Sequence, residues 1–465
     1  MYSLDDKLTE VIEVIGQYKL EGEITPQGSK NGALPLIAAS IIFDYPIKIH
    51  NVPFIEDVNI LLEILKYINC KVDFNENTLS IDPRSINRYD IPWDLASKLR
   101  ASFDLLGPIV FKFSKARIPF PGGCLIGNRK VDMHLYSAKQ LGFEVELNKG
   151  DVLVHNFNKT KVNKVINFWI PSVGATKNIV FLASFVANLI NDEIIINNIA
   201  VEPEIIKLFE FLISNGFNLE YCIEKRYLKV KPFKMVNFSN FIEHNIPDRI
   251  EAGTYILASL ATKGKIFIQD STSYFNHSKK YFKVSSMLSS LIEVLKYVGF
   301  KIEVYNDGIY AEYNEANNIK PINVETGFFP EFPTDLQPQI VALAISLNSV
   351  STVKEKVFDD RFIYVNELRR LGADIDIIDN KIAIIKGGNK LSGANVIATD
   401  IRGGAAILIA ALIAENTSTI SNIYQLKRGY ENLIHKLSTL KAKVKLKKLN
   451  KDSIQEKAII PNVKD

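Results

Sequence analysis

The sequence is poor in the residues that bind metals or form disulfides. Only three of its 465 residues are cysteine and six are histidine. Cys70, Cys124 and Cys222 lie far apart and are odd in number, so they do not suggest a disulfide framework. Cys-x-x-Cys is missing, and the histidines show no ligand spacing. We therefore expect neither a metal site nor a cofactor.

The sequence also lacks a large excess of charge and a long apolar run, and we expect no leader segment. The net charge is only +4, and the basic residues are spread along the chain, which argues against a nucleic-acid partner. Apolar runs such as Ile407–Ala414 are far shorter than a membrane span. Residues Met1–Lys7 lack the basic and apolar regions of a signal peptide. These features predict a cytoplasmic protein without membrane insertion.

A helical pattern recurs six times in a composition that is otherwise ordinary, with 47% hydrophobic and 23% charged residues. Apolar runs rich in small residues predict a first helix in each copy, at 31–42, 101–111, 175–189, 250–261, 336–347 and 403–414. A second, amphipathic helix follows in each copy, at 58–68, 135–142, 205–216, 289–299, 362–372 and 431–440. Each second helix leads into a strand, at 71–74, 143–147, 217–221, 301–305, 374–377 and 443–446.

This repeat predicts an α/β fold built from βαβαββ units with a period of roughly 70–80 residues. A chain of this length is too long for one core, so we expect two domains of three units, with helices inside and sheets outside. A chance alternation of helices and strands is the alternative. Residues 271–286 interrupt the period as an insertion. Residues 1–14 and the lysine-rich end from Lys441 onward are expected to be peripheral.

One glycine-rich stretch carries a candidate reactive thiol. Pro119–Arg129 holds Cys124 among three glycines and two prolines, so it is expected to form a loop. The nearby guanidinium of Arg129 favours the thiolate over the thiol. On local grounds alone, a buried cysteine in a turn is the alternative.

Two other positions have only local interpretations. Lys30 stands at an expected helix start, where backbone N–H groups and the helix dipole favour anions. Asp335 lies ahead of an apolar helix, where an aspartate often serves as the N-cap. Neither position carries a function by itself.

Ten short motifs follow one another along nearly the whole chain. They are Gly28–Asn31, Leu99–Ser102, Pro121–Arg129, Val131–His134, Ser172–Thr176, Pro247–Thr254, Phe332–Gln337, Phe358–Phe362, Ala398–Arg402 and Arg428–Glu431. Each motif is weak alone. Together, and in this order, they resemble the motifs of the enolpyruvyl transferase family.

The resemblance implies a fold and a domain division. The fold would be a two-domain inside-out α/β barrel of six βαβαββ repeats, three in each domain. Residues 1–29 with 248–465 would form one discontinuous domain, and residues 30–247 the middle domain. Substrates would bind in the cleft between the domains, and closure would bring the Cys124 lid over them.

The resemblance also implies an activity, with two small-molecule substrates. The enolpyruvyl group of phosphoenolpyruvate would pass to the 3-hydroxyl of UDP-N-acetylglucosamine with release of phosphate, the first committed step of peptidoglycan biosynthesis. Cys124 would be the general acid at C3 of phosphoenolpyruvate and the target of fosfomycin. Asp335 would orient or deprotonate the hydroxyl, and Lys30 would act beside it. Cys70 and Cys222 are expected to be inert core residues.

Phosphoenolpyruvate carries a phosphate and a carboxylate on three carbons, so its site needs several cations. By resemblance, Lys30, Arg129 and Arg428 would bind mainly the phosphate. Arg361 and Arg402 would bind mainly the carboxylate. For any single arginine the alternative is a solvated surface charge.

The uridine nucleotide would contact two further motifs. Asp132 would pair with the uracil edge, and the backbone of Ser172, Val173 and Gly174 would donate to the diphosphate. The full set of substrate-binding residues implied by the resemblance is Asn31, Arg100, Arg129, Val131, Asp132, Met133, Ser172, Val173, Gly174, Asp335, Val357, Arg361, Arg402 and Arg428.

Three positions depart from the family pattern, and they bear on the nucleotide half of the site. They are Lys130, Ile170 and Lys177. The polar residues that match the family without a predicted chemical role are Arg100, Glu202, Asp248 and Asp400, which we expect to support the site or domain closure. The alternatives are an enolpyruvyl transferase for another uridine nucleotide or sugar, and a silent nucleotide-binding homologue.

Overall fold

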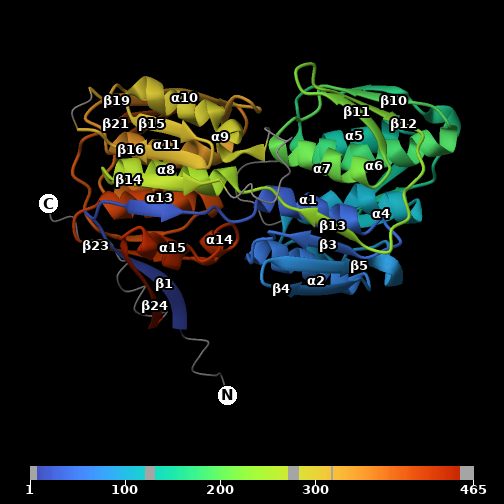
Figure 1. The fold of residues 1–465 in the computed structure, drawn as a ribbon, viewed down its shortest axis with the longest axis horizontal. Coiled ribbons are helices and arrows are strands. Elements are labelled where there is room, and N and C mark those ends of the chain that lie inside the picture. Colours follow the sequence, from blue (N-terminus) through green and yellow to red (C-terminus); the bar gives the residue numbers. More distant parts are fainter. Residues whose placement is uncertain (1–7, 121–130, 271–281, 316–317, 451–465) are drawn as a thin grey trace.

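Helices and strands alternate from end to end of the chain (Figure 1). The computed structural model describes residues 8–120, 131–270, 282–315 and 318–450. The predicted Cys124 loop, with Arg129 and Lys130, lies outside these residues, as does most of the 271–286 insertion. In the described part of the chain the strands form six sheets.

Three of these sheets consist of strands that lie before residue 25 or after residue 264. The first has the order β22 (Asn395–Ile397), β23 (Thr417–Ser421), β1 (Leu8–Ile15) and β24 (Lys443–Asn450). The second has the order β15 (Lys301–Tyr305), β16 (Gly308–Glu312), β14 (Lys265–Gln269) and β2 (Glu21–Ile24). The third has the order β18 (Phe332–Pro333), β17 (Asn323–Gly327), β19 (Val350–Lys354), β21 (Ile382–Lys386) and β20 (Asp374–Ile378).

The other three sheets contain strands from residues 47–244. One has the order β13 (Phe241–His244), β3 (Ile47–His50), β5 (Thr78–Asp82) and β4 (Lys71–Asn75). Another has the order β11 (Asn218–Cys222), β12 (Tyr227–Lys231), β10 (Ile194–Asn197) and β9 (Val165–Asn167). The last has the order β6 (Ala116–Pro119), β8 (Asp151–His155) and β7 (Glu144–Asn148).

Five of the six sheets share one hydrogen-bonding arrangement. A parallel pair is followed by two antiparallel neighbours, as in the run β9, β10, β12, β11. The pairs β22–β23, β2–β14, β17–β19 and β13–β3 are the corresponding parallel pairs. In the three-stranded sheet, the outer strand of the parallel pair is replaced by a single parallel bridge from Asp90 to Arg117. The α/β class with mixed sheets is therefore confirmed.

The helices fall into two groups that match the two sets of three sheets, and Figure 1 shows these groups side by side. One group is α1 (Lys30–Ser40), α2 (Glu56–Tyr67), α3 (Trp93–Ala96), α4 (Leu106–Phe113), α5 (Asp132–Gln140), α6 (Val173–Ile190) and α7 (Pro203–Ser214). The other is α8 (Arg249–Ala261), α9 (Val284–Met287), α10 (Ser289–Val298), α11 (Gln337–Ile345), α12 (Val365–Arg370), α13 (Ile401–Ile413), α14 (Tyr424–Lys427) and α15 (Leu433–Thr439).

Small residues allow the central helices to approach closely. Helices α8, α11 and α13 pack against one another, and every residue of α8 and α11 is buried. A Cβ at Gly253 of α8 would lie 2.7 Å from a methyl carbon of Leu336, so a larger residue there would force the Leu336 side chain to shift. The predicted helices rich in small residues are thus the buried ones.

Two sequence predictions about the fold were wrong. The stretch 101–111 is not one helix, because a 3-10 helix at Arg100–Leu105 precedes α4. Pro108 has no N–H to donate within a continuous helix, so the α-helix begins only two residues before it. Neither chain end is peripheral throughout, because β1 and β24 pair antiparallel along eight residues. Val11 and Val14 of β1 are fully buried.

Helix α6 has the length and hydropathy of a membrane span, the one such helix among the described residues. Two thirds of it is buried within the protein, at 67%. It packs against α4 and α5, as a core helix does.

Candidate active site

Lys30 is a buried cation at the first position of α1. Ser29 caps the helix, and its hydroxyl accepts a 3.1 Å hydrogen bond from the backbone N–H of Gly32. The Lys30 Nζ lies 3.0 Å from Oδ2 of Asp57. Burial lowers the pKa of Lys30, the Asp57 carboxylate opposes this, and the charge of Arg402 adds to the lowering. The lysine therefore lies near two other cations, Arg402 and Arg428.

Asp57 joins Lys30 to Arg428, and the sequence did not point to it. Its Oδ1 accepts a 2.7 Å hydrogen bond from Nε of Arg428, and its side chain is almost fully buried. Burial alone would raise the pKa of Asp57, but the two cations outweigh it and the pKa lies below its ordinary value. In the sequence, Asp57 is one of two acidic residues in the first turn of α2, where acids are common without a further role.

Asp335 lies between two buried guanidinium groups. Its Oδ1 is 3.2 Å from Nη2 of Arg361, and its Oδ2 is 3.0 Å from Nη2 of Arg402. Both arginines are at most 4% exposed, so neither is a solvated surface charge. Burial lowers the pKa of Arg402, but Asp335, Tyr430 and Asp248 together outweigh this and the pKa is raised. Asp335 is not the cap of α11, because it sits inside the preceding 3-10 helix and Leu336 is the N-cap.

Arg361 keeps unused hydrogen-bonding capacity. Its Nη2 also donates to the backbone oxygen of Thr334 at 3.0 Å. Its buried Nε and Nη1 have no hydrogen-bond partner among the described residues. Val357 lies in the loop that leads to this arginine, and its N–H donates to Glu355 at 2.8 Å. A buried guanidinium in this state is suited to a planar anion such as a carboxylate.

Two aspartates fix the backbone around these cations. Asp248 caps α8 and also accepts a 3.1 Å hydrogen bond from the backbone N–H of Lys30. Asp400 caps α13 and accepts from the backbone N–H of Arg402 at 3.0 Å. Asn31 reaches Oδ2 of Asp335 at 3.5 Å, which brings the start of α1 to the Asp335 cluster. Both capping roles fit the predicted supporting function.

The residues predicted for the nucleotide lie at two adjacent helix starts. Asp132 begins α5, and its Oδ1 accepts from the N–H of Met133 at 2.9 Å. Ser172 caps α6, and its hydroxyl accepts from Ala175 at 3.2 Å. A Cβ at Gly174 would lie 2.7 Å from Nε2 of His134, so the two helix starts touch. Val131 and Met133 are buried, Asp132 is exposed, and Ser172 and Val173 are half-buried.

His134 is a further residue of this group that was not predicted as a site residue. Burial lowers its pKa to about 3, and Arg100 and Lys177 add to this effect. The imidazole is therefore neutral, and its buried Nδ1 has no partner among the described residues. His134 belongs to the Val131–His134 motif, so the sequence contained a motif that could have identified it as a site residue.

The departures from the family pattern occupy different environments. Lys177 is buried and pairs with Asp104, with Nζ 2.9 Å from Oδ2. Ile170 is exposed ahead of α6. Glu202, which matches the family pattern, is buried before α7, where burial raises its pKa against the opposing charge of Arg249.

The two described cysteines differ from each other. Cys70 is buried, as predicted, and burial raises the pKa of its thiol to about 12, which disfavours the reactive thiolate. Cys222 was wrongly predicted to lie in the core. It is half-exposed at the end of β11, and its Sγ donates to Oε2 of Glu224 at 3.3 Å.

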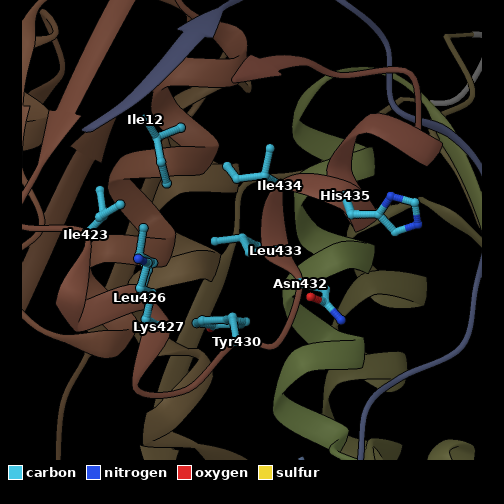
Figure 2. A pocket seen from close by; sticks show the side chains of 9 residues that line it. All are labelled: Ile12, Ile423, Leu426, Lys427, Tyr430, Asn432, Leu433, Ile434 and His435. Carbon is cyan, nitrogen blue, oxygen red and sulfur yellow. The ribbon is translucent and has the colours of Figure 1, made fainter. Parts of the chain in front are cut away.

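One hollow, next to Tyr430, is distinct from the candidate active site. It is lined by Ile12, Ile423, Leu426, Lys427, Tyr430, Asn432, Leu433, Ile434 and His435 (Figure 2). None of these is a predicted site residue. The lining is largely apolar, whereas the predicted substrate is a small anion. Tyr430 links the two regions, because its ring centroid is 5.8 Å from Cζ of Arg402.

Comparisons with known proteins agree along nearly the whole chain. Residues 14–437 match the family model of EPSP synthase (3-phosphoshikimate 1-carboxyvinyltransferase). The UDP-N-acetylglucosamine 1-carboxyvinyltransferase of Thermotoga maritima is 39% identical over 432 residues, which are 93% of this chain and 97% of that protein. The protein of the same name from the Wolbachia of Brugia malayi is 38% identical, over 94% of this chain and 99% of that protein.

Two solved structures share the fold. The enolpyruvyl transferase NikO from Streptomyces tendae superimposes with a TM-score of 0.80 and 20% identity, over 95% of this chain and 99% of that chain. EPSP synthase from Acinetobacter baumannii gives a TM-score of 0.66 and 12% identity, over 94% of this chain and 100% of that chain. The chain belongs to the EPSP synthase family of enolpyruvyl transferases, and within it to the UDP-N-acetylglucosamine 1-carboxyvinyltransferases.

Proposed function

We propose that the protein transfers the enolpyruvyl group of phosphoenolpyruvate to the 3-hydroxyl of UDP-N-acetylglucosamine and releases phosphate. The observation that carries this proposal is the gathering of four buried cations around two carboxylates. Lys30 and Arg428 meet at Asp57, and Arg361 and Arg402 meet at Asp335. A small substrate with a phosphate and a carboxylate requires two such groups of cations in a site shielded from water.

The two groups of cations suit the two ends of phosphoenolpyruvate. Lys30 and Arg428, together with Arg129 outside the described residues, would bind the phosphate. Arg361 and Arg402 would bind the carboxylate, and the unused N–H groups of Arg361 support this assignment. Substrate phosphate would share the positive charge that Asp57 now neutralises.

The proposed reaction adds the sugar hydroxyl to C2 of phosphoenolpyruvate. Asp335 would orient the hydroxyl and accept its proton, and Cys124 would deliver a proton to C3. Loss of a proton from C3 would then expel phosphate and leave an enol ether. Asn31 is suited to hold the hydroxyl, because its amide already reaches Oδ2 of Asp335.

We propose that Asp132 and the N-terminus of α6 bind the nucleotide. The backbone N–H groups at the N-terminus of this long helix, next to Arg100 and Lys177, favour a diphosphate. Val131, Met133, Ser172, Val173 and Gly174 line the same two helix starts. The chain would thus take two small-molecule substrates. The cytoplasmic location remains a prediction.

We also propose the finer architecture, with six βαβαββ units as two inside-out barrels, helices inside and sheets outside. The arrangement shared by five sheets and the buried central helices support it. Residues 1–29 with 248–465 would form one domain and 30–247 the other. The division is supported by the sheets, because each sheet takes its strands from one proposed domain only. It is also supported by the two places where the chain passes between the domains, which are adjacent: the N–H of Ser29 donates to the backbone oxygen of Ile246 at 2.7 Å.

A phosphate-release assay tests the proposal. Phosphoenolpyruvate with UDP-N-acetylglucosamine should release phosphate, and omission of the nucleotide sugar should stop it. UDP-glucose and UDP-N-acetylgalactosamine should be much poorer acceptors. Asp335→Asn should lower kcat by about a hundredfold or more while the protein remains folded. Faster release with another uridine nucleotide would favour the alternative acceptor, and no release with any would favour a silent homologue.

A further inference from the structure

The side-chain amide of Gln27 makes two hydrogen bonds to the segment Arg428–Glu431. Its Nε2 donates to the backbone oxygen of Gly429 at 2.9 Å, and its Oε1 accepts from the backbone N–H of Glu431 at 2.6 Å. Gln27 is 5% exposed, so both bonds are shielded from water. The two bonds flank Tyr430, and Figure 2 shows how this residue leads through Asn432 into α15.

Gln27 is itself held in place by α8. Its backbone N–H donates to Oε2 of Glu251 at 2.6 Å, and its backbone oxygen accepts from Asp248 at 2.8 Å. The next residue, Gly28, must be glycine, because a Cβ there would lie 1.7 Å from the backbone oxygen of Asn51. Gln27 is therefore a fixed point three residues before Lys30.

The Arg428–Glu431 segment extends from this fixed point toward residues on the other side of the site. Arg428 contacts Asp57, as described above. The Oε1 of Glu431 accepts from the N–H of Phe54 at 3.0 Å and from Nδ2 of Asn77 at 2.8 Å. Both ends of the segment thus bond to residues 54–77, while Gln27 holds its centre.

We propose that Gln27 is a positioning residue that sets the place of Arg428 for phosphoenolpyruvate. This inference rests on the proposed function. Gln27 does not touch the substrate in this account, and acts only through the peptide groups that follow Arg428. The amide supplies the donor for Gly429 and the acceptor for Glu431 at once, whereas an ionised carboxylate only accepts and an aliphatic chain does neither.

The first test compares Gln27→Met with Gln27→Glu. Methionine has the same length but neither bond, and glutamate keeps only the acceptor. We expect KM for phosphoenolpyruvate to rise about tenfold in Gln27→Met, with a smaller selective rise in Gln27→Glu. KM for UDP-N-acetylglucosamine should change less than about twofold. Gln17→Met is the matched control, because that amide also donates to a backbone oxygen, at Ile413, and its KM values should not change.

The second test places Gln27→Met in an Arg428→Ala background and uses the residual turnover. If Gln27 acts through Arg428, its replacement should change KM for phosphoenolpyruvate less than about twofold there. An unchanged KM in the single variant would overturn the proposal. So would a tenfold rise that persists without Arg428, or equal changes for both substrates. A wild-type protein that releases no phosphate would instead refute the proposed function, before any variant is compared.

Discussion

Nε of Arg428 donates a 2.7 Å hydrogen bond to Oδ1 of Asp57, although the two residues are 371 positions apart in the chain. The same carboxylate binds Lys30 through its other oxygen. Two cations from opposite ends of the sequence therefore share one buried negative charge. Because a substrate phosphate would be attracted to the same place, this contact links stability to substrate binding.

Asp57→Asn should destabilise the protein by about 3–5 kcal/mol, because it leaves two buried cations without their carboxylate. Inorganic phosphate should restore part of this loss by supplying negative charge. Urea unfolding with and without phosphate measures both effects. Glu63→Gln removes an exposed ion pair with Lys66 and should change stability by less than about 0.5 kcal/mol. A loss in Asp57→Asn as small as in this control would contradict the account.

Arg402→Ala should raise KM for phosphoenolpyruvate far more than KM for the nucleotide sugar. A buried, charge-assisted contact of this kind contributes roughly 1.5–3 kcal/mol, which corresponds to about a 10- to 100-fold rise. Arg84→Ala is the control, because that arginine is exposed and pairs only locally with Asp82. Equal rises in both KM values would remove Arg402 from its assigned role. Initial-rate kinetics with each substrate varied in turn decides the matter.

Glu251 should make stability depend on pH near neutrality. Burial raises the pKa of Glu251 to about 7 from an ordinary value of 4.5. The folded protein therefore holds this proton more tightly than the unfolded chain, and the resulting stability is lost as pH rises from about 4.5 through 7. Glu251→Gln stays uncharged. Its stability relative to the wild type should increase between about pH 5 and pH 8, by no more than about 3 kcal/mol. A pH-independent difference in urea unfolding would refute this.

Fosfomycin should inactivate the protein through Cys124. Cys70 is buried with a raised pKa and should not react, but Cys222 is half-exposed and provides the sharper internal control. Peptide mapping should find the adduct on Cys124 alone, and UDP-N-acetylglucosamine should speed its formation. Cys124→Asp should resist the compound. An adduct on Cys222, or labelling that persists in the aspartate variant, would contradict the assignment.

The fold was largely predictable because its units are local. Apolar periodicity and a closing glycine locate helices such as α10, which ends where Gly299 adopts a positive φ of 113°. A local pattern carries no information about which distant strands pair with each other. The pairing of β1 with β24 brings residues 8–15 and 443–450 together, so the local pattern predicted the strand at 443–446 but placed the chain from Lys441 onward at the periphery.

In the site too, residues within local motifs were predictable and contacts between distant parts of the chain were not. Lys30, Asp335, Arg361 and Arg402 were predicted through motifs, and the structure brings them together with Arg428. Asp57 was missed because an acid in the first turn of a helix has an ordinary explanation. The contact that makes it unusual comes from the other end of the chain. Local capping logic likewise suggested an N-cap for Asp335, whereas two distant guanidinium groups hold it.

Product analysis tests the central claim most directly. The protein is incubated with phosphoenolpyruvate and UDP-N-acetylglucosamine, and the nucleotide product is analysed by mass spectrometry alongside released phosphate. We predict one enolpyruvyl group added per phosphate released, and no product from the matched 3-deoxy acceptor. Phosphate release without an enolpyruvyl-modified nucleotide sugar, or equal reaction of the 3-deoxy acceptor, would contradict it.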